Sequence, residues 1–452
     1  MAHLRKSKSN SLLCNVQEAL HAHIKPDSRL TIALSGGVDS VVLLHLLSKL
    51  SGKIPFSLYA VHVNHGISRN AMHWSQFCCN LCHRHGISIH VAYLKIHKKT
   101  GTSLEAIARE ERYRVFDQIP TDYIVLAQHL DDQAETLLLQ LLRGAGIKGL
   151  SGMPLIRKQS AASTSQLLRP LLNVSREQIE TYARQNQLDW IHDESNDDIA
   201  INRNFLRHEI FPVLKKRYPS YAKTLLRTSR HLSEASLLLD ELAEIDHDYC
   251  LISGKLSLEN LRALSYTRAK NLLRYHLSRH NIPLPSSVKL EDILRQLLSA
   301  QVDRQIHIHF GHAEIRCYQG LVHVLTKHAS VATPQYCQYC WHGEAELTLD
   351  PIKSKIMFMR IKNQGIDQQK IANERITIRT RQGGEYFKPA CNRPRRNLKN
   401  LLQEASIPPW RRQIMPLLFC NEQLIWVPGI GIDCEFQVKS NDIGIVPIWN
   451  HE

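Results

Sequence analysis

The sequence lacks any long apolar run of the kind that marks a membrane protein. No stretch approaches the ~18 consecutive apolar residues of a transmembrane helix, although 43% of the 452 residues are hydrophobic. The N-terminal segment MAHLRKSKSNSLL is basic and has no apolar core ahead of a small-residue cleavage site. These absences argue against membrane-spanning and exported proteins, and we expect a cytoplasmic protein with no membrane partner.

Two common nucleotide-binding signatures are missing after the first predicted strand, RLTIAL. A Walker loop requires Gly-Lys-Ser/Thr, and a dinucleotide fingerprint requires Gly-x-Gly-x-x-Gly. The strand is followed instead by Ser-Gly-Gly-Val-Asp-Ser, residues 35–40. A nucleotide bound here must therefore be held by a loop of another kind.

Cysteine is not scarce, but its pattern does not indicate disulfides. Eleven cysteines in a long chain without an export signal are expected to be free thiols. CNLCH at Cys79–His83, with His85 close by, has the spacing of a haem attachment site, and CQYCWH at Cys337–His342 resembles half of a zinc site. Haem attachment requires export, and the zinc half-sites lie far apart in sequence. We therefore interpret both clusters as structural and expect Cys79 and Cys82 to be small apolar residues of a helix.

Acidic residues are outnumbered by basic ones. The 57 lysines and arginines exceed the 42 aspartates and glutamates, which gives a net charge of +15. Such a charge favours a polyanionic partner, and nucleic acid is the first candidate.

Apolar runs and helical patterns alternate through the N-terminal half. Expected strands at 29–34, 56–63, 87–94 and 122–128 alternate with expected helices at 39–50, 70–86, 102–119 and 131–144. This order predicts an α/β fold with a doubly wound parallel sheet. Ligands bind such sheets at the carboxyl ends of the strands, so we expect four loops to meet there, at 35–40, 62–66, 96–103 and 128–135.

Residues 35–40, named here the glycine loop, suit a phosphate group. Gly36, Gly37 and Val38 can turn successive N–H groups into one concavity, and the following helix adds its positive end. Hydroxyls of Ser35 and Ser40 can donate to phosphate oxygens. Asp39 would repel phosphate unless it binds Mg²⁺ or serves only as a helix cap. The loop resembles the PP-loop of the ATP pyrophosphatase superfamily, which implies cleavage of ATP between its α- and β-phosphates.

A second acidic segment, DDQAET, opens the helix expected from Asp131 to Gly144. Asp131 and Glu135 share a face at i,i+4 spacing, and Asp132 lies three residues before Glu135. These carboxylates can hold an amine or Mg²⁺, with Asp132 as a metal candidate beside Asp39, and one can act as a general base. The simpler alternative is a helix whose acidic first turn complements its dipole.

Five further segments occur in order, and together with the glycine loop they resemble the tRNA(Ile)-lysidine synthetase family over about 180 residues. They are HVNHGISRNAMHWSQF (62–77), EAIAREERYRVF (105–116), AQHLDDQAETLLLQLLRGAGIKGLSGM (127–153), LLRPLL (167–172) and DESNDDIAINRNFLRHEIFP (193–212). The resemblance implies that ATP adenylates the C2 oxygen of the wobble cytidine in a tRNA(Ile) with a CAU anticodon. The ε-amine of L-lysine then replaces AMP. The family also suggests a homodimer.

Basic and imidazole side chains near the expected site are further candidates. Arg109 and Arg112 share a helix face, where one guanidinium can neutralise charge building on the α-phosphate or both can simply be solvated. The histidines at the strand ends can contact adenine, ribose or the reacting base, or can be structural: His62, His65 and His129. Arg203 and Arg207 form a basic helical face that either grips the anticodon loop or clamps the edge of the sheet.

The remaining chain is expected to bind the body of the tRNA. We predict a catalytic domain at 1–218, a mostly helical middle domain at 219–330 with strands near its end, a linker or short strands at 331–372, and a small α+β domain at 373–452. Residues 375–412 contain ten lysines and arginines against two glutamates, a net charge of +8. The tRNA-binding candidates there combine phosphate contacts with stacking: Arg395, Arg396, Lys399, Trp410, Arg411 and Arg412.

Two other functions compete with this interpretation. A tRNA-thiolating PP-loop enzyme would use paired cysteines, for which Cys79 and Cys82 are the candidates. A non-catalytic RNA-binding protein that senses ATP would not need Asp39 together with the acidic helix. A synthetase of small metabolites would leave the basic C-terminal region without a role.

Overall fold

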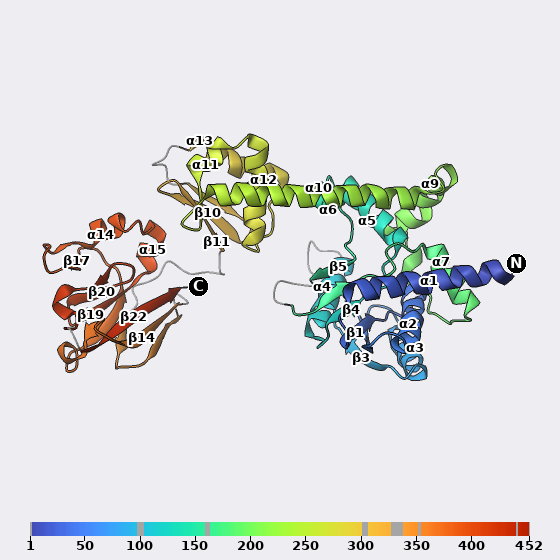
Figure 1. The fold of residues 1–452 in the computed structure, drawn as a ribbon, viewed down its shortest axis with the longest axis horizontal. Coiled ribbons are helices and arrows are strands. Elements are labelled where there is room, and N and C mark those ends of the chain that lie inside the picture. The colour runs from blue at the N-terminus through green and yellow to red at the C-terminus, as the bar shows by residue number, and fades with distance from the viewer. Residues whose placement is uncertain are drawn as a thin grey trace. The chain divides into compact units, whose positions relative to one another are not determined.

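The computed structural model describes residues 2–96, 104–158, 163–300, 306–326, 338–350, 354–439 and 442–451. The chain divides into two compact units, Met1–Leu239 and Asp240–Glu452 (Figure 1). Of the helices in these ranges, none is long and apolar enough to cross a membrane.

The first unit is built on a six-stranded sheet with the order β3-β2-β1-β4-β6-β5. All neighbouring strands are parallel except the edge pair β5–β6. The predicted doubly wound α/β fold is therefore confirmed. The strands are β1 (Ser28–Ala33), β2 (Phe56–Asn64), β3 (Ser88–Tyr93), β4 (Tyr123–Val125), β5 (Ile156–Lys158) and β6 (Gln166–Leu168).

Helices cover both faces of this sheet. On one face, buried apolar side chains of α1, α2, α3 and α7 pack against β1 and β4, while α4 closes a smaller core on the other face. The helices are α1 (Ala2–His23), α2 (Val38–Ser51), α3 (Ala71–Arg84), α4 (Leu104–Gln118), α5 (Leu130–Leu142), α6 (Ile147–Leu150), α7 (Arg176–Gln185), η1 (Glu194–Asp197), α8 (Asn202–Phe205), η2 (Leu206–Ile210) and α9 (Phe211–Arg217).

The observed elements differ from the predicted ones in a few places. The sequence pattern did not reveal α1, β5 or β6. Helix α1 is polar on most of its length, β5 (IRK) includes two basic residues and β6 (QLL) has only two apolar ones. Helix α5 begins at Leu130, one residue before the predicted start at Asp131, and has His129 as its N-cap.

The second unit contains a helical layer and a five-stranded sheet with the order β7-β8-β11-β10-β9. Helix α10 (Tyr221–Cys250) includes the boundary between the two units in its sequence. Strands β9, β10 and β11 lie near the end of the predicted middle domain, where strands were expected. The other elements are β7 (Leu251–Ile252), β8 (Lys255–Ser257), α11 (Leu258–Ala263), α12 (Tyr266–Arg279), α13 (Ser287–Ser299), β9 (His307–Phe310), β10 (Ala313–Tyr318) and β11 (Leu321–Thr326).

The C-terminal part of the second unit packs two antiparallel sheets around a common core. For residues 331–372 we predicted a linker or short strands; where described, they form strands, and β14 pairs with β22 over nine residue pairs. The elements are β12 (Gln338–Trp341), β13 (Glu346–Leu349), β14 (Ser354–Lys362), β15 (Ile366–Asp367), η4 (Gln368–Lys370), β16 (Ile376–Thr380), β17 (Tyr386–Phe387), β18 (Arg396–Asn397), α14 (Leu398–Glu404), α15 (Pro409–Ile414), β19 (Pro416–Cys420), β20 (Gln423–Val427), β21 (Gly431–Ile432), η5 (Cys434–Phe436) and β22 (Ile443–His451).

Candidate active site

The glycine loop joins β1 to α2 at the carboxyl end of β1, as the sequence predicts. Gly36 has a φ of +89°, and a Cβ built there would lie 2.5 Å from Cδ1 of Ile191. The backbone N–H of Ile191 donates to the carbonyl of Gly36 at 2.9 Å. Only glycine fits this conformation and this close contact without strain.

The serines of the glycine loop have different surroundings. Ser40 is buried; its hydroxyl accepts from the N–H of Gly36 at 3.1 Å and donates to the carbonyl of Gly37 at 2.9 Å. Ser35 is exposed and lies within 3.1 Å of the Ser40 hydroxyl. We predicted both serines as phosphate donors, but in this structure the Ser40 hydroxyl holds the loop closed.

The start of α2 is suited to an anion. Its N-cap, Gly37, provides no side-chain hydrogen bond to the first turn, where Val38 and Asp39 follow. The unsatisfied N–H groups of a first turn carry partial positive charge. The loop can therefore hold phosphate oxygens through its backbone.

Three carboxylates surround the buried imidazole of His129. Nε2 of His129 lies 3.6 Å from Asp39 Oδ1 and 3.5 Å from Asp132 Oδ2, and Nδ1 lies 3.7 Å from Asp131 Oδ2. The backbone N–H of His129 also donates to Asp132 at 3.0 Å. Chain segments about 90 residues apart thus form one acidic cluster, and His129 is its centre rather than a group at the site's edge.

Arg176 joins this cluster, although the sequence analysis did not single it out. Its guanidinium donates to Asp39 Oδ2 at 3.0 Å and its backbone N–H donates to Asp131 Oδ2 at 2.8 Å. Arg176 begins α7 directly after the capping residue Ser175. An arginine at a helix start, soon after LLRPLL, is the signal that could have suggested it.

The acidic cluster fits a divalent cation. Asp39 Oδ1 is buried and has no hydrogen-bond partner among the described residues. Burial raises the pKa of Asp39, while the neighbouring His129 and Arg176 oppose that rise. A buried carboxylate oxygen without a donor, with oxygens of Asp131 and Asp132 around the same imidazole, has the ligand chemistry that Mg²⁺ prefers.

Glu135 has a different environment from the three aspartates. Its side chain is 1% exposed, and Arg207 contacts Oε1 through Nε at 2.9 Å and through Nη2 at 2.8 Å. Arg203 approaches Oε2 at 3.7 Å and donates to Thr136 at 3.0 Å. These contacts tie Arg203 and Arg207 to helix α5 rather than to the edge of the sheet, and contact of these residues with RNA stays a prediction.

The histidines at the end of β2 are bound by other protein groups. His62 is buried, its Nδ1 lies 2.9 Å from the carbonyl of Leu34, and burial lowers its pKa. Burial also lowers the pKa of His65 to about 4, so its neutral Nε2 accepts from Arg112 at 3.3 Å. His62 therefore supports the glycine loop from behind, and His65 positions Arg112.

Arg109 and Arg112 are exposed on α4, as their helical spacing predicts. The guanidinium of Arg109 lies 5.3 Å from the ring centre of Tyr113, and Arg112 contacts His65. The predicted loop at 96–103 lies outside the described residues apart from its first position.

The cysteines of helix α3 provide no metal-binding group among the described residues, and two of them are buried thiols. Burial raises the pKa of Cys78 and of Cys82 to about 12, so both are thiols. Sγ of Cys78 lies 4.0 Å from the carbonyl of Leu34, behind the glycine loop. Cys79 and Cys82 belong to no metal-binding group among the described residues, and Cys337 lies outside those residues.

The basic candidates of the C-terminal region separate into exposed and packed side chains. Three of the candidates are exposed: Arg395, Lys399 and Arg411. Arg395 also lies 3.3 Å from Glu435. Arg396 is half-buried and pairs with Glu404 at 3.0 Å.

Two of the candidates are packed more closely than predicted. Arg412 is buried and donates to Tyr318 Oη at 2.7 Å, and Trp410 is half-buried with its ring 5.1 Å from that of His323. Both side chains contact residues of β10 and β11, so they are less accessible to RNA than the exposed candidates.

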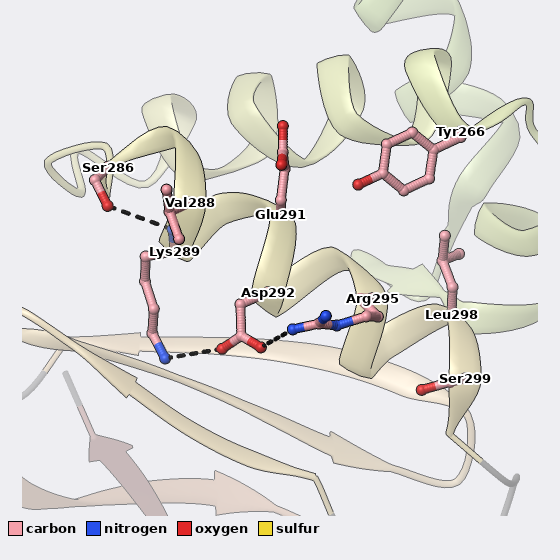
Figure 2. Close-up of a pocket in the computed structure, with 9 residues that line it drawn as sticks. All are labelled: Tyr266, Ser286, Val288, Lys289, Glu291, Asp292, Arg295, Leu298 and Ser299. Atoms are coloured by element: carbon pink, nitrogen blue, oxygen red, sulfur yellow. Dashed lines mark hydrogen bonds and ion pairs between the residues drawn. The ribbon is translucent and has the colours of Figure 1, made fainter.

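A cavity of about 760 Å³ lies in the second unit between α12 and α13 (Figure 2). Figure 2 shows Lys289 and Arg295 turned toward Asp292, which they contact at 3.3 and 2.8 Å. The lining carries two basic and two acidic side chains, whose formal charges sum to zero.

Comparisons with known proteins cover nearly the whole chain. Three family descriptions match: "PP-loop domain" over residues 7–214, "TilS substrate binding domain" over 256–323 and "TilS substrate C-terminal domain" over 376–449.

Curated relatives match over nearly their full length. A tRNA(Ile)-lysidine synthase of Nitrosomonas europaea is 50% identical over 95% of this chain and 94% of its own. Proteins of the same name from Coxiella burnetii and an Azoarcus species are each 37% identical, over 94% and 95% of this chain and 93% of their own. Among solved structures, a U34-tRNA thiolase of Methanococcus maripaludis has a TM-score of 0.44 at 19% identity, over 51% of this chain and 80% of that chain.

Proposed function

Because the chain belongs to the tRNA(Ile)-lysidine synthase family, we propose that it joins L-lysine to C2 of the wobble cytidine in the CAU anticodon of tRNA(Ile). The C2 oxygen takes AMP from ATP with release of pyrophosphate, and the ε-amine of lysine then forms the C–N bond as AMP leaves with that oxygen. The product base pairs with A instead of G, so the tRNA accepts isoleucine in place of methionine.

The observation that carries this proposal is the acidic cluster beside the glycine loop. Backbone N–H groups at Gly37 and Val38, with the Ser35 hydroxyl, bind the phosphates of ATP. Asp39 and Asp132 would hold Mg²⁺, which would supply positive charge between the phosphates and the carboxylates. Arg176 donates to Oδ2 of Asp39 at 3.0 Å and leaves Oδ1 without a hydrogen-bond partner among the described residues, so Oδ1 is the oxygen available to the ion.

The lysine amine is bound by the aspartates that remain accessible. Asp131 and Asp132 are 29% and 17% exposed, whereas Glu135 is 1% exposed and held by Arg207. A general base must reach the ammonium proton directly or through one water. We therefore assign binding of the lysine ammonium to Asp131 and Asp132, and its deprotonation to Asp131, because Asp132 would also hold Mg²⁺. We assign to Glu135 the positioning of α5 through Arg207.

The arginines of α4 neutralise the negative charge that develops on the reacting phosphate. Arg112 is exposed and oriented by neutral His65, and Arg109 lies one turn away. A guanidinium aimed at developing negative charge lowers the barrier more than it favours the ground state. The body of the tRNA is bound by the exposed side chains Arg395, Lys399 and Arg411, and the family resemblance leads us to propose a homodimer, which light scattering would test.

The decisive assay supplies labelled lysine, ATP, Mg²⁺ and a tRNA(Ile) transcript with a CAU anticodon. We expect label in the tRNA and one AMP per lysine incorporated. Incorporation of sulfur from a sulfur donor in place of lysine, or no AMP release, would contradict the proposal. A tRNA(Ile) transcript with a GAU anticodon is the matched control and should remain unlabelled.

The role of Asp39 is tested by Asp39→Asn. This variant should lose AMP formation by at least 100-fold, because the amide cannot replace a charged metal ligand, and should keep tRNA binding. Asp117→Asn, at an exposed carboxylate near the end of α4, is the control and should be fully active. Full activity of Asp39→Asn would refute the metal role.

A further inference from the structure

Two histidines and a glutamate meet on one face of the hairpin β9–β10 in the second unit. Along β9, His307 and His309 are exposed, whereas Ile308 and Phe310 are buried. Glu314 lies opposite His309 in the antiparallel pair. Since opposite residues share a face and residues two apart share a face, all three side chains converge above this edge of the sheet.

The donor atoms are spaced like the ligands of a small metal ion. Oε2 of Glu314 lies 2.8 Å from Nε2 of His307 and 3.5 Å from Nδ1 of His309. One donor atom from each of the three residues can be chosen so that all lie within 4.8 Å of one another. In a tetrahedral site with bonds of ~2.0–2.2 Å, ligand atoms are ~3.3–3.6 Å apart, so small rotations of the side chains bring them to metal-binding distances.

Arg316 fixes the carboxylate without occupying the shared oxygen. Its Nε lies 2.9 Å from Oε1 of Glu314, while Oε2 faces the two imidazoles. Outer partners that orient a ligating carboxylate are typical of metal sites. The arginine thus leaves one carboxylate oxygen and two ring nitrogens directed at a common point.

We propose that His307, His309 and Glu314 bind a divalent transition-metal ion of the zinc class, with water at the fourth position. Two imidazoles and one carboxylate are a ligand set used for such ions and a poor set for Mg²⁺, which prefers oxygen. The ion would tie the edge strand β9 to β10. This site is independent of the proposed catalytic function, because its ligands all lie in the second unit.

The test measures metal binding by the full chain rather than its activity. Metal-free protein is titrated with Co²⁺, whose visible absorption reports coordination, and then with Zn²⁺ against a chelating indicator, with excess Mg²⁺ and ATP present. The wild type should show one site that the double variant His307→Ala/His309→Ala weakens by at least 100-fold. His312→Ala removes an exposed histidine from the turn of the same hairpin and should bind like the wild type.

A more conservative variant separates ligation from folding. Glu314→Gln keeps the size of the side chain and should weaken Zn²⁺ binding by about tenfold, with X-ray absorption of the wild-type complex showing two imidazoles and no sulfur. If the double histidine variant binds the same number of ions with the same affinity, or if the wild-type ion has sulfur ligands, the proposal is wrong. The hairpin would then hold only the contacts of Glu314 with His307, His309 and Arg316.

Discussion

Replacing Arg207 by methionine tests how the buried carboxylate of Glu135 is held. The Glu135 side chain is 1% exposed, and Arg207 contacts its Oε1 at 2.8 and 2.9 Å. Removing one partner of a buried ion pair costs ~3–5 kcal/mol, because the remaining charge stays desolvated. Arg203 still lies 3.7 Å from Oε2, so we expect the lower end of that range, a destabilisation of about 3 kcal/mol.

Hydrogen–deuterium exchange of the α5 amides in the full chain measures this cost where it arises. A loss of ~3 kcal/mol corresponds to ~150-fold faster exchange, since 1.36 kcal/mol is a factor of ten. Arg203→Met is the matched control and should accelerate exchange less than tenfold, because its contact with the carboxylate is longer. Exchange in Arg207→Met within threefold of the wild type would refute the reasoning.

The loss of stability caused by Arg207→Met should depend on pH in a definite direction. Burial raises the pKa of Glu135, and Arg207 opposes that rise. Between the unfolded and folded pKa values the folded state binds more protons, so stability falls as the pH rises through that window. Without Arg207 the folded pKa rises further. The loss of stability in Arg207→Met relative to the wild type should therefore be larger at pH 8 than at pH 5.5, after correction for the intrinsic exchange rates.

A double variant tests whether the buried charge itself is the cause. Arg207→Met/Glu135→Gln removes the charge together with its partner and should recover most of the lost stability. If the double variant exchanges as fast as Arg207→Met alone, the cost comes from lost packing of the arginine stem and not from the carboxylate.

Further predictions concern the glycine loop, the cysteines and the tRNA surface. Gly36→Ala should lower the melting temperature and abolish AMP release because of its φ of +89° and the 2.5 Å approach to Ile191, whereas Gly52→Ala, which meets no atom within 4 Å, should not. The variant Cys79→Ser/Cys82→Ala should keep lysine ligation. If a folded variant loses activity, the alternative of a tRNA-thiolating enzyme that uses these cysteines is supported. Arg395→Ala, Lys399→Ala and Arg411→Ala should each reduce the slope of log affinity for tRNA against log salt by about one. Arg412→Ala should instead lower the melting temperature and leave that slope unchanged, because Arg412 is buried against Tyr318; a change of slope would contradict this assignment.

The order of strands and the place of the glycine loop could be predicted from sequence because both depend on local patterns. Apolar runs bounded by helical periodicity identified β1 to β4, and the rule for parallel sheets placed the glycine loop and the start of α5 at one edge. The structure brings Asp39 and Asp131 around His129 there. Strand β4 has three residues like β5 and β6, but it lies within the longer apolar run DYIVLAQ, whereas β5 (IRK) includes two basic residues and β6 (QLL) has only two apolar ones.

Pairings between distant side chains could not be predicted in this way. Arg207 lies in a π-helical segment, η2, that turns its side chain differently from an ideal α-helix. Its partner Glu135 is 72 residues away, and no spacing rule connects the two. Ser40 shows the same limit on a smaller scale, because a hydroxyl in a phosphate loop can equally well close that loop.

The four acidic residues of the site differ in their contacts with guanidinium groups, and this difference narrows the candidates for the general base. Asp39 already contacts a guanidinium and carries the buried oxygen suited to a cation, and Glu135 is enclosed by Arg203 and Arg207. A group that takes a proton from an incoming amine must exchange that proton with water afterwards. Asp132 lies 3.8 Å from the guanidinium of Arg207, whereas Asp131 is 29% exposed and contacts no guanidinium among the described residues. We therefore propose Asp131, in the first turn of α5, as the general base.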